Sequence, residues 1–192
     1  MVFSLISTLV VLVGLSGFLS WILNSIVFGV VTKTASDHIE TGTSSLGASF
    51  NYTLSGLPSL LAAKLVSGLL IVAGLILFIV PGIFIAIMFS LVIPTVVIEQ
   101  KGAFESLGRS KRLVSKRWGN TFLVTLVVAL IVGIPMGVVN GVASVFSAAD
   151  PVIVLVVRQV FNAFLCSIFP IALTCLYYSM VARETSSQPP IY

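Results

Sequence analysis

Charged residues are scarce in this chain of 192 residues, making up 8% of it, whereas 58% of the residues are hydrophobic. A soluble domain usually carries about 25% charged residues. A surface that faces water cannot be built from so few charges, so the apolar side chains must face lipid as well as one another. The mean hydropathy of +1.18 agrees with this. The scarcity excludes a soluble domain and indicates an integral membrane protein.

Side chains that carry out catalysis are also scarce. The chain has one histidine, His38, which lies between Asp37 and Glu40. Positions 38 and 40 of a helix point in different directions, so this group predicts a solvated cluster at the membrane edge and not a metal site. No phosphate-binding glycine loop, nucleophile elbow or His-Glu-x-x-His pattern occurs. The sequence therefore predicts that the protein is not an enzyme and needs no metal or other cofactor.

The two cysteines, Cys166 and Cys175, are nine positions apart in one apolar run. On a helix this spacing separates them by roughly 13 Å along the axis, so they cannot pair with each other. We expect them to be packing residues, and no redox compartment follows from them.

Long apolar runs fill most of the chain. A helix needs about 20 residues to cross the hydrocarbon core, and the run from Ser59 to Ile98 is about twice that length. It must fold back, and Pro81-Gly82 is the predicted turn because proline ends a helix and glycine accepts the backbone angles of a reversal. The first run has no basic flank, so we expect a retained helix and not a cleaved signal peptide. The predicted crossings are at about 2–31, 60–80, 83–98, 120–139 and 152–181.

A less apolar stretch at about 44–57 predicts a helix that lies on the membrane surface. Its apolar residues recur at helical spacing, which places them on one face. These residues are Leu46, Phe50, Leu54 and Leu57.

The connector 99–119 holds six of the ten basic residues and contains a second predicted surface helix at about 103–117. On a helical wheel, Arg109, Arg112 and Lys116 cluster on one side. A basic amphipathic helix binds anionic membrane surfaces, so these three residues are candidate contacts with anionic lipid headgroups or with a protein partner. The apolar residues of the opposite face are Phe104, Leu107, Val114 and Trp118.

These segments predict a single integral membrane domain over residues 1–192. Its fold class is all-α: a polytopic transmembrane helical bundle of about five crossings with two interfacial amphipathic helices. With five crossings the two ends of the chain lie on opposite sides. Nine of the ten basic residues fall on one side, and the positive-inside rule makes that side the cytoplasm. The N-terminus is then outside and the C-terminus cytoplasmic, and the basic residues report membrane orientation and not nucleic-acid binding.

Arg158 is the exception to this charge asymmetry, because it lies inside the last apolar run. A charge within the hydrocarbon is costly, so an embedded arginine is a candidate site for an anionic headgroup or substrate. The alternative is that the long last helix starts early and Arg158 extends to the outer interface.

Three glycines, Gly133, Gly137 and Gly141, recur every four residues in the fourth predicted crossing. This pattern makes a flat stripe on which another helix can pack closely. We expect packing within the same chain, with a neighbouring chain as the alternative.

A pattern of residues between Ile79 and Trp118 resembles a known type of membrane domain. Its residues are Val80-Pro81-Gly82-Ile83, Pro94, Val97-Ile98-Glu99, Gly102, Arg109-Ser110, Leu113 and Trp118, and the ending Leu176-Tyr177-Tyr178 with Arg183 is similar too. The domain is the one attached to some bacterial glycerophosphoryl diester phosphodiesterases, also seen in related multi-pass proteins. The resemblance spans about residues 29–184 and implies a helical membrane domain. The catalytic barrel has no counterpart here, so the hydrolytic activity is not carried over. Proteins of this type often have one more N-terminal helix, which makes six crossings the alternative to five.

The leading functional hypothesis is a non-catalytic scaffold or accessory subunit of a membrane assembly. Its expected partners are the bilayer, anionic lipid headgroups, and a membrane protein or a second copy of the chain. The alternative is a small transporter or lipid-handling permease, which a water-filled cavity leading to Arg158 would favour.

Overall fold

The computed structural model describes residues 2–146 and 151–186, and every regular element in these ranges is a helix. The eight helices are α1 (Val2–Thr41), α2 (Leu46–Ser55), α3 (Leu57–Leu77), α4 (Ile79–Met88), α5 (Val92–Glu99), α6 (Ala103–Ser115), α7 (Trp118–Phe146) and α8 (Pro151–Ser186). Five helical segments are long and apolar enough to cross a membrane: Val10–Thr41, Leu57–Leu77, Ile79–Glu99, Trp118–Val145 and Val154–Glu184. The predicted all-α membrane fold is confirmed.

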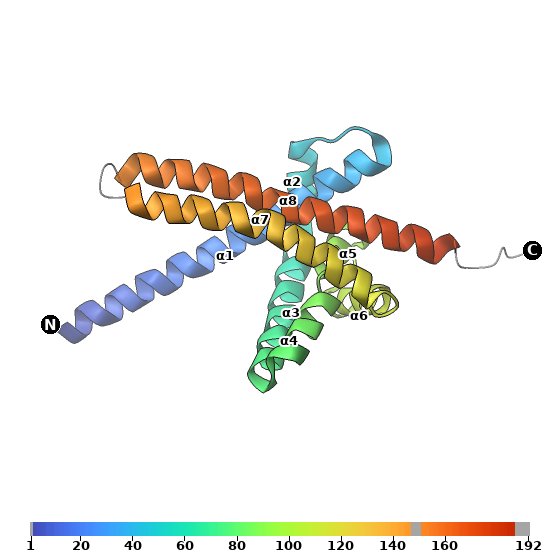
Figure 1. Ribbon diagram of the computed structural model, residues 1–192, viewed down its shortest axis with the longest axis horizontal. Coiled ribbons are helices and arrows are strands. Elements are labelled where there is room, and N and C mark those ends of the chain that lie inside the picture. Colours follow the sequence, from blue (N-terminus) through green and yellow to red (C-terminus); the bar gives the residue numbers. More distant parts are fainter. Residues whose placement is uncertain (1, 147–150, 187–192) are drawn as a thin grey trace, which may run out of the picture.

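The long helices share one direction, and a helical hairpin lies across them (Figure 1). Helices α7 and α8 run side by side, and α1 extends toward the same end of the molecule as the connection between them. The hairpin of α3 and α4 crosses this group, and α5 and α6 lie beside the crossing. The C-terminal ends of α1 and α8 therefore lie toward one end of the molecule, together with the short helices.

The hairpin turns at Phe78, so the predicted turn at Pro81-Gly82 was wrong by three residues. Phe78 is the single extended residue between α3 and α4, with φ −161° and ψ 146°. Pro81 instead occupies the first turn of α4, where a backbone N–H would have no helical partner. Because hydrocarbon offers no hydrogen bonds, a proline there removes one donor that would otherwise be unsatisfied.

The tip of this hairpin is apolar and open. Ile76, Leu77, Phe78, Ile79 and Val80 are each at least 70% exposed in the chain. Five consecutive large apolar side chains are unfavourable in water, so this tip belongs in lipid.

Two glycines bring the arms of the hairpin together. A Cβ atom built on Gly82 would lie 2.7 Å from the backbone nitrogen of Leu75, and one built on Gly74 would lie 3.0 Å from the Cα of Gly82. Real Cβ atoms do not approach that closely. The glycine that predicted a turn is therefore a packing residue between α3 and α4.

The third predicted crossing, 83–98, is two helices. Pro94 lies in the first turn of α5, and a proline at that position clashes with the carbonyl of Ser90 if the preceding residues are helical. Helix α4 therefore ends at Met88 and α5 begins at Val92.

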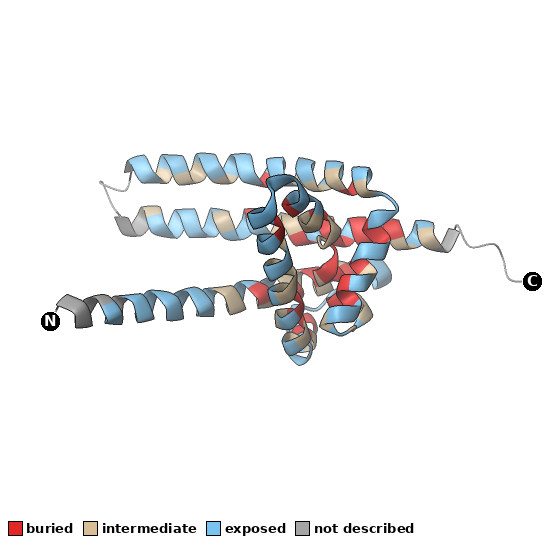
Figure 2. Cartoon of the chain, turned by 90° about the horizontal axis from the view of Figure 1, so that it is seen from below, coloured by how far each residue is buried: buried red, intermediate tan, exposed pale blue. Residues whose placement is uncertain are grey.

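Two apolar cores meet at α6, at the crossing point of the long helices and the hairpin. One core joins α4, α6 and α8, and its buried residues include Leu113, Val114 and Leu176. The other joins α3, α5 and α6 and includes Leu107. In Figure 2 the buried residues gather at this end of the molecule, whereas the far halves of the long helices are exposed. Those exposed surfaces are apolar, as expected for surfaces that face lipid.

Three helices extend beyond their predicted ends, and in α1 polar contacts accompany the extension. Helix α1 reaches Thr41 and not residue 31. In this extension Lys33 pairs with Asp37 at 2.7 Å and lies 4.4 Å above the ring centre of Tyr52 in α2. Helices α7 and α8 are also longer than predicted. The predicted external connector 147–150 lies outside the described residues.

Candidate functional site

A cluster of charged side chains joins α5, α6 and α8 at the end of the molecule where the short helices lie. Its centre is Glu99, the last residue of α5. The Glu99 carboxylate accepts a hydrogen bond from the Arg109 Nε at 3.0 Å and pairs with Lys101. It also accepts a hydrogen bond from the hydroxyl of Tyr177 in α8. One carboxylate therefore links α5 to the neighbouring helix α6 and to α8, which is distant in sequence.

Arg109 completes this cluster and is not a free basic residue. Its Nη1 lies 2.7 Å from the carboxylate of Glu184, and its side chain is only 17% exposed. Burial would lower the pKa of Arg109, but its hydrogen bonds to Glu99 and Glu184 hold that pKa above its ordinary value. Two carboxylates of the same chain already bind its guanidinium, which favours a packing role for Arg109 over the predicted contact with anionic lipid or a partner.

The other two predicted contacts, Arg112 and Lys116, line a cleft of about 190 Å³ between α6 and α8. Arg117 and Arg183 complete the basic lining of this hollow, which we call the basic cleft. The remaining residues of its lining are Leu113, Met180 and Glu184.

The four cations of the basic cleft form no ion pair within the described ranges. Its single acid, Glu184, is paired with Arg109. The structure thus brings two of the three predicted residues together and adds two that the helical wheel did not select. Four uncompensated cations around one small hollow are suited to an anion.

Part of the apolar face of α6 packs on the protein. Leu107 and Val114 are 7% and 0% exposed, respectively, and belong to the two apolar cores. Phe104, predicted to lie on the same face, is 77% exposed. The wheel thus predicted the amphipathic character of α6, but the chain itself covers two residues of the face that was expected to meet the membrane interface.

The hydroxyl of Ser110 also fixes α6, because it donates a hydrogen bond of 2.7 Å to the carbonyl of Met88. Met88 is the last residue of α4, whose terminal carbonyls lack helical partners. The helix that carries Arg112 is thus fastened to the end of α4.

A second polar link ties α8 to α1. The hydroxyl of Tyr178 shares a hydrogen bond of 2.7 Å with Ser36 and donates one to Glu40. The acids of the predicted juxtamembrane cluster are thus engaged, Asp37 with Lys33 and Glu40 with Tyr178. These contacts serve the packing of α1 on α8.

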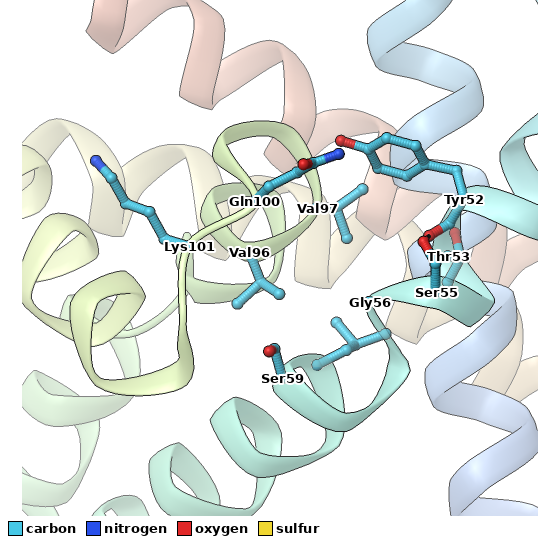
Figure 3. A pocket seen from close by; sticks show the side chains of 10 residues that line it. Tyr52, Thr53, Ser55, Gly56, Ser59, Val96, Val97, Gln100 and Lys101 are labelled. Carbon is cyan, nitrogen blue, oxygen red and sulfur yellow. Dashed lines mark hydrogen bonds between the residues drawn. The ribbon is translucent and has the colours of Figure 1, made fainter.

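A polar pocket of about 250 Å³ lies where α2 and α3 face the end of α5 (Figure 3). The side chains of Gln100 and Tyr52 reach toward one another across it, whereas Lys101 points away. Lys101 is the one charged residue of the lining, and its ammonium binds Glu99. The pocket offers hydroxyls and an amide but no free charge, so it is less suited to an ion than the basic cleft.

A family model described as a domain of unknown function, DUF7847, matches residues 1–180. The chain belongs to the DUF7847 family. No curated protein and no solved structure matches it. The resemblance to the membrane domain of glycerophosphoryl diester phosphodiesterases stays a prediction.

The glycine stripe of this DUF7847 domain packs on no other helix in the described part of the chain. A Cβ atom built on Gly133, Gly137 or Gly141 would meet no heavy atom within 4 Å among the described residues. The stripe is exposed on α7, so the expectation of packing within the same chain is wrong. Packing against a neighbouring chain stays a prediction.

Arg158 is exposed on α8, in the half of the helix that lies away from the basic cleft. It borders a hollow between α7 and α8, which we describe further below. The structure therefore separates Arg158 from the basic residues of α6.

Glu99, Tyr177 and Glu184 were not predicted as parts of the site. They lie at or near the ends of apolar runs, and pattern analysis within one segment cannot pair them with Arg109. Two signals were available: Glu99 and Tyr177 belong to the pattern that carries the family resemblance, and Glu99 ends a long apolar run, where an acid in a membrane protein needs a partner.

Proposed function

We propose that the protein is a non-catalytic multi-pass protein of the cell membrane that acts as a scaffold or accessory subunit and binds anionic lipid at its basic cleft. The observation that supports this most is the set of four cations, Arg112, Lys116, Arg117 and Arg183, which surround one hollow and form no ion pair with any described residue. A lipid phosphate or other headgroup anion would pair with several of them at once.

Charge asymmetry supports a cytoplasmic position for the basic cleft. The cleft and the Glu99 cluster lie at the end of the molecule where α8 reaches its C-terminus. Basic residues are retained on the cytoplasmic side of membrane proteins, where the leaflet is also anionic. In this orientation the N-terminus is outside and the C-terminus is cytoplasmic.

The polar clusters support a structural role more than a catalytic one. The Glu99 carboxylate binds Lys101, Arg109 and Tyr177. A carboxylate that is bound by two cations is a poor general base, because they stabilise its charged form. The hydrogen bonds instead fasten α5, α6 and α8 together, as a scaffold requires.

A transporter is the weaker alternative. It would need a water-filled path to the embedded charge, whereas seven of the eight residues that line the hollow beside Arg158 are apolar. The hollow lies against exposed side chains such as Val138 and Val142 and is therefore open to lipid.

Thermal unfolding of the purified full chain, measured with short-chain anionic or zwitterionic lipid, tests the lipid part of the proposal. Dioctanoyl phosphatidylglycerol should stabilise the chain more than dioctanoyl phosphatidylcholine, by about 2.7 kcal/mol at a hundred times the dissociation constant. Combined replacement Arg112→Gln, Lys116→Gln and Arg183→Gln should lower this difference by the share that the basic cleft contributes. Lys111→Gln is the matched control, because Lys111 is exposed on the same helix but does not line the cleft. An equal lipid preference in the triple variant and the control would contradict the proposal.

Co-purification in mild detergent tests the scaffold part. We expect a membrane protein retained at fixed stoichiometry. A chain that purifies alone under these conditions contradicts the subunit role and leaves lipid binding to be decided by the titration.

A further inference from the structure

A hollow of about 310 Å³ lies between α7 and α8, far from the basic cleft along α8. Its lining is apolar except for Arg158: Val138, Val139, Val142, Ala143, Val154, Val157 and Phe161. We call this hollow the valine groove. Val138, Val142 and Val157 are each at least 50% exposed, so the groove is open along the side of the helix pair.

Arg158 has no partner in the described part of the chain. No hydrogen bond, ion pair or ring contact involves its side chain, and the residue is exposed. A guanidinium without a counterion beside an apolar surface is unfavourable unless water or an anion reaches it.

The position of Arg158 along α8 fixes the depth at which such an anion would lie. Arg158 and Arg183 are on one continuous helix, and 25 residues at about 1.5 Å each separate them by roughly 37 Å. The hydrocarbon core is about 30 Å thick. When Arg183 lies in one headgroup layer, Arg158 therefore reaches the other.

We infer that the valine groove binds an anionic phospholipid of the leaflet opposite the basic cleft. The lipid phosphate pairs with the guanidinium of Arg158, which can donate two parallel hydrogen bonds to it. One acyl chain lies along the valines between α7 and α8 and covers their exposed surface. A soluble phosphate would satisfy only the arginine, whereas a phospholipid satisfies both parts of the groove.

Native mass spectrometry of the full chain in a mixture of phosphatidylglycerol and phosphatidylcholine tests this inference. The background variant carries Arg112→Gln, Lys116→Gln and Arg183→Gln, so that lipid bound at the basic cleft does not contribute. We expect this variant to retain one phosphatidylglycerol. Adding Arg158→Gln should weaken that binding roughly ten- to hundredfold, as expected for loss of a charged hydrogen bond.

Two further measurements separate the parts of the groove. Val142→Trp fills the groove while Arg158 is unchanged, so it should also weaken phosphatidylglycerol binding, with unfolding in phosphatidylcholine as the check of folding. Inorganic phosphate at millimolar concentration should not displace the lipid. Equal binding with and without Arg158→Gln would overturn the inference. Displacement by phosphate alone, or a dimer that excludes lipid from the groove, would also overturn it.

Discussion

Replacing Gly82 by alanine tests the packing of the helical hairpin more sharply than any other single change. The added Cβ atom would lie 2.7 Å from the backbone nitrogen of Leu75 and 2.5 Å from its Cδ2. The side chain of Leu75 could rotate away, but the backbone nitrogen cannot, so α3 and α4 must move apart. Overpacking of this kind typically costs 1–3 kcal/mol, and the higher helix propensity of alanine offsets about 1 kcal/mol of it. We expect a net loss of up to about 2 kcal/mol.

Gly137→Ala is the matched control, because it is the same change in a helix where no heavy atom lies within 4 Å of the added carbon. There only the helix propensity acts, so the variant should be as stable as the wild type or up to about 1 kcal/mol more stable. Thermal unfolding of the full chain in one detergent measures both. For a chain of this size, 1 kcal/mol shifts Tm by about 2–4 °C. Gly82→Ala unfolding at or above the temperature of Gly137→Ala would refute the reasoning.

Three further predictions follow from the polar clusters and the hairpin tip. Glu99→Gln should lower the free energy of unfolding by about 1–3 kcal/mol, since it removes the negative charge that compensates Arg109 and Lys101. The control Glu105→Gln, at an exposed position of α6, should change the free energy of unfolding little. Equal denaturation midpoints of the two variants would show that the cluster adds no stability. Tyr178→Phe should lower the free energy of unfolding by about 1 kcal/mol because its hydrogen bonds are lost. The same unfolding assay measures this, and an unchanged free energy of unfolding would mean that α1 is held by apolar contacts alone. In a background without the two native cysteines, Phe78→Cys should be labelled only slowly by an impermeant maleimide in opened membranes, because the hairpin tip lies in lipid. Rapid labelling would place the tip in water.

Composition and hydropathy predicted the helical membrane fold because these properties depend on the solvent that the chain requires. Each of the five predicted crossings overlaps a helical segment that is long and apolar enough to span a membrane. The end of the first crossing was misjudged, since residues 32–41 continue α1 with an ion pair inside the helix and with contacts to α2 and α8. The break at Phe78 was missed because a proline is tolerated in the first turn of a helix as well as in a turn.

The helical wheel of α6 shows what periodicity cannot decide. It separates an apolar face from a basic one, but it does not say whether protein or lipid covers the apolar face. The chain covers Leu107 and Val114 itself. It also directs Arg109 to Glu99 and Glu184, which are 10 and 75 residues away along the chain. Pairings over such separations depend on the packing of whole helices.

The small-residue pattern was misleading for a related reason. Gly133, Gly137 and Gly141 match a known packing motif but face outward, whereas Gly74 and Gly82 lie outside any regular spacing and allow a close approach between α3 and α4. A glycine motif shows where a helix could approach, and the fold determines where one does.

Photocrosslinking at the basic cleft tests the central claim of anionic lipid binding most directly. A photoreactive benzoylphenylalanine in place of Arg117 lies in the lining of the cleft, and one in place of Lys111 on the same helix lies outside it. After irradiation of the full chain in membranes, we expect position 117 to carry an adduct with the mass of an anionic phospholipid, well above the level at position 111. Equal lipid adducts at the two positions, or only protein adducts at position 117, would contradict the account.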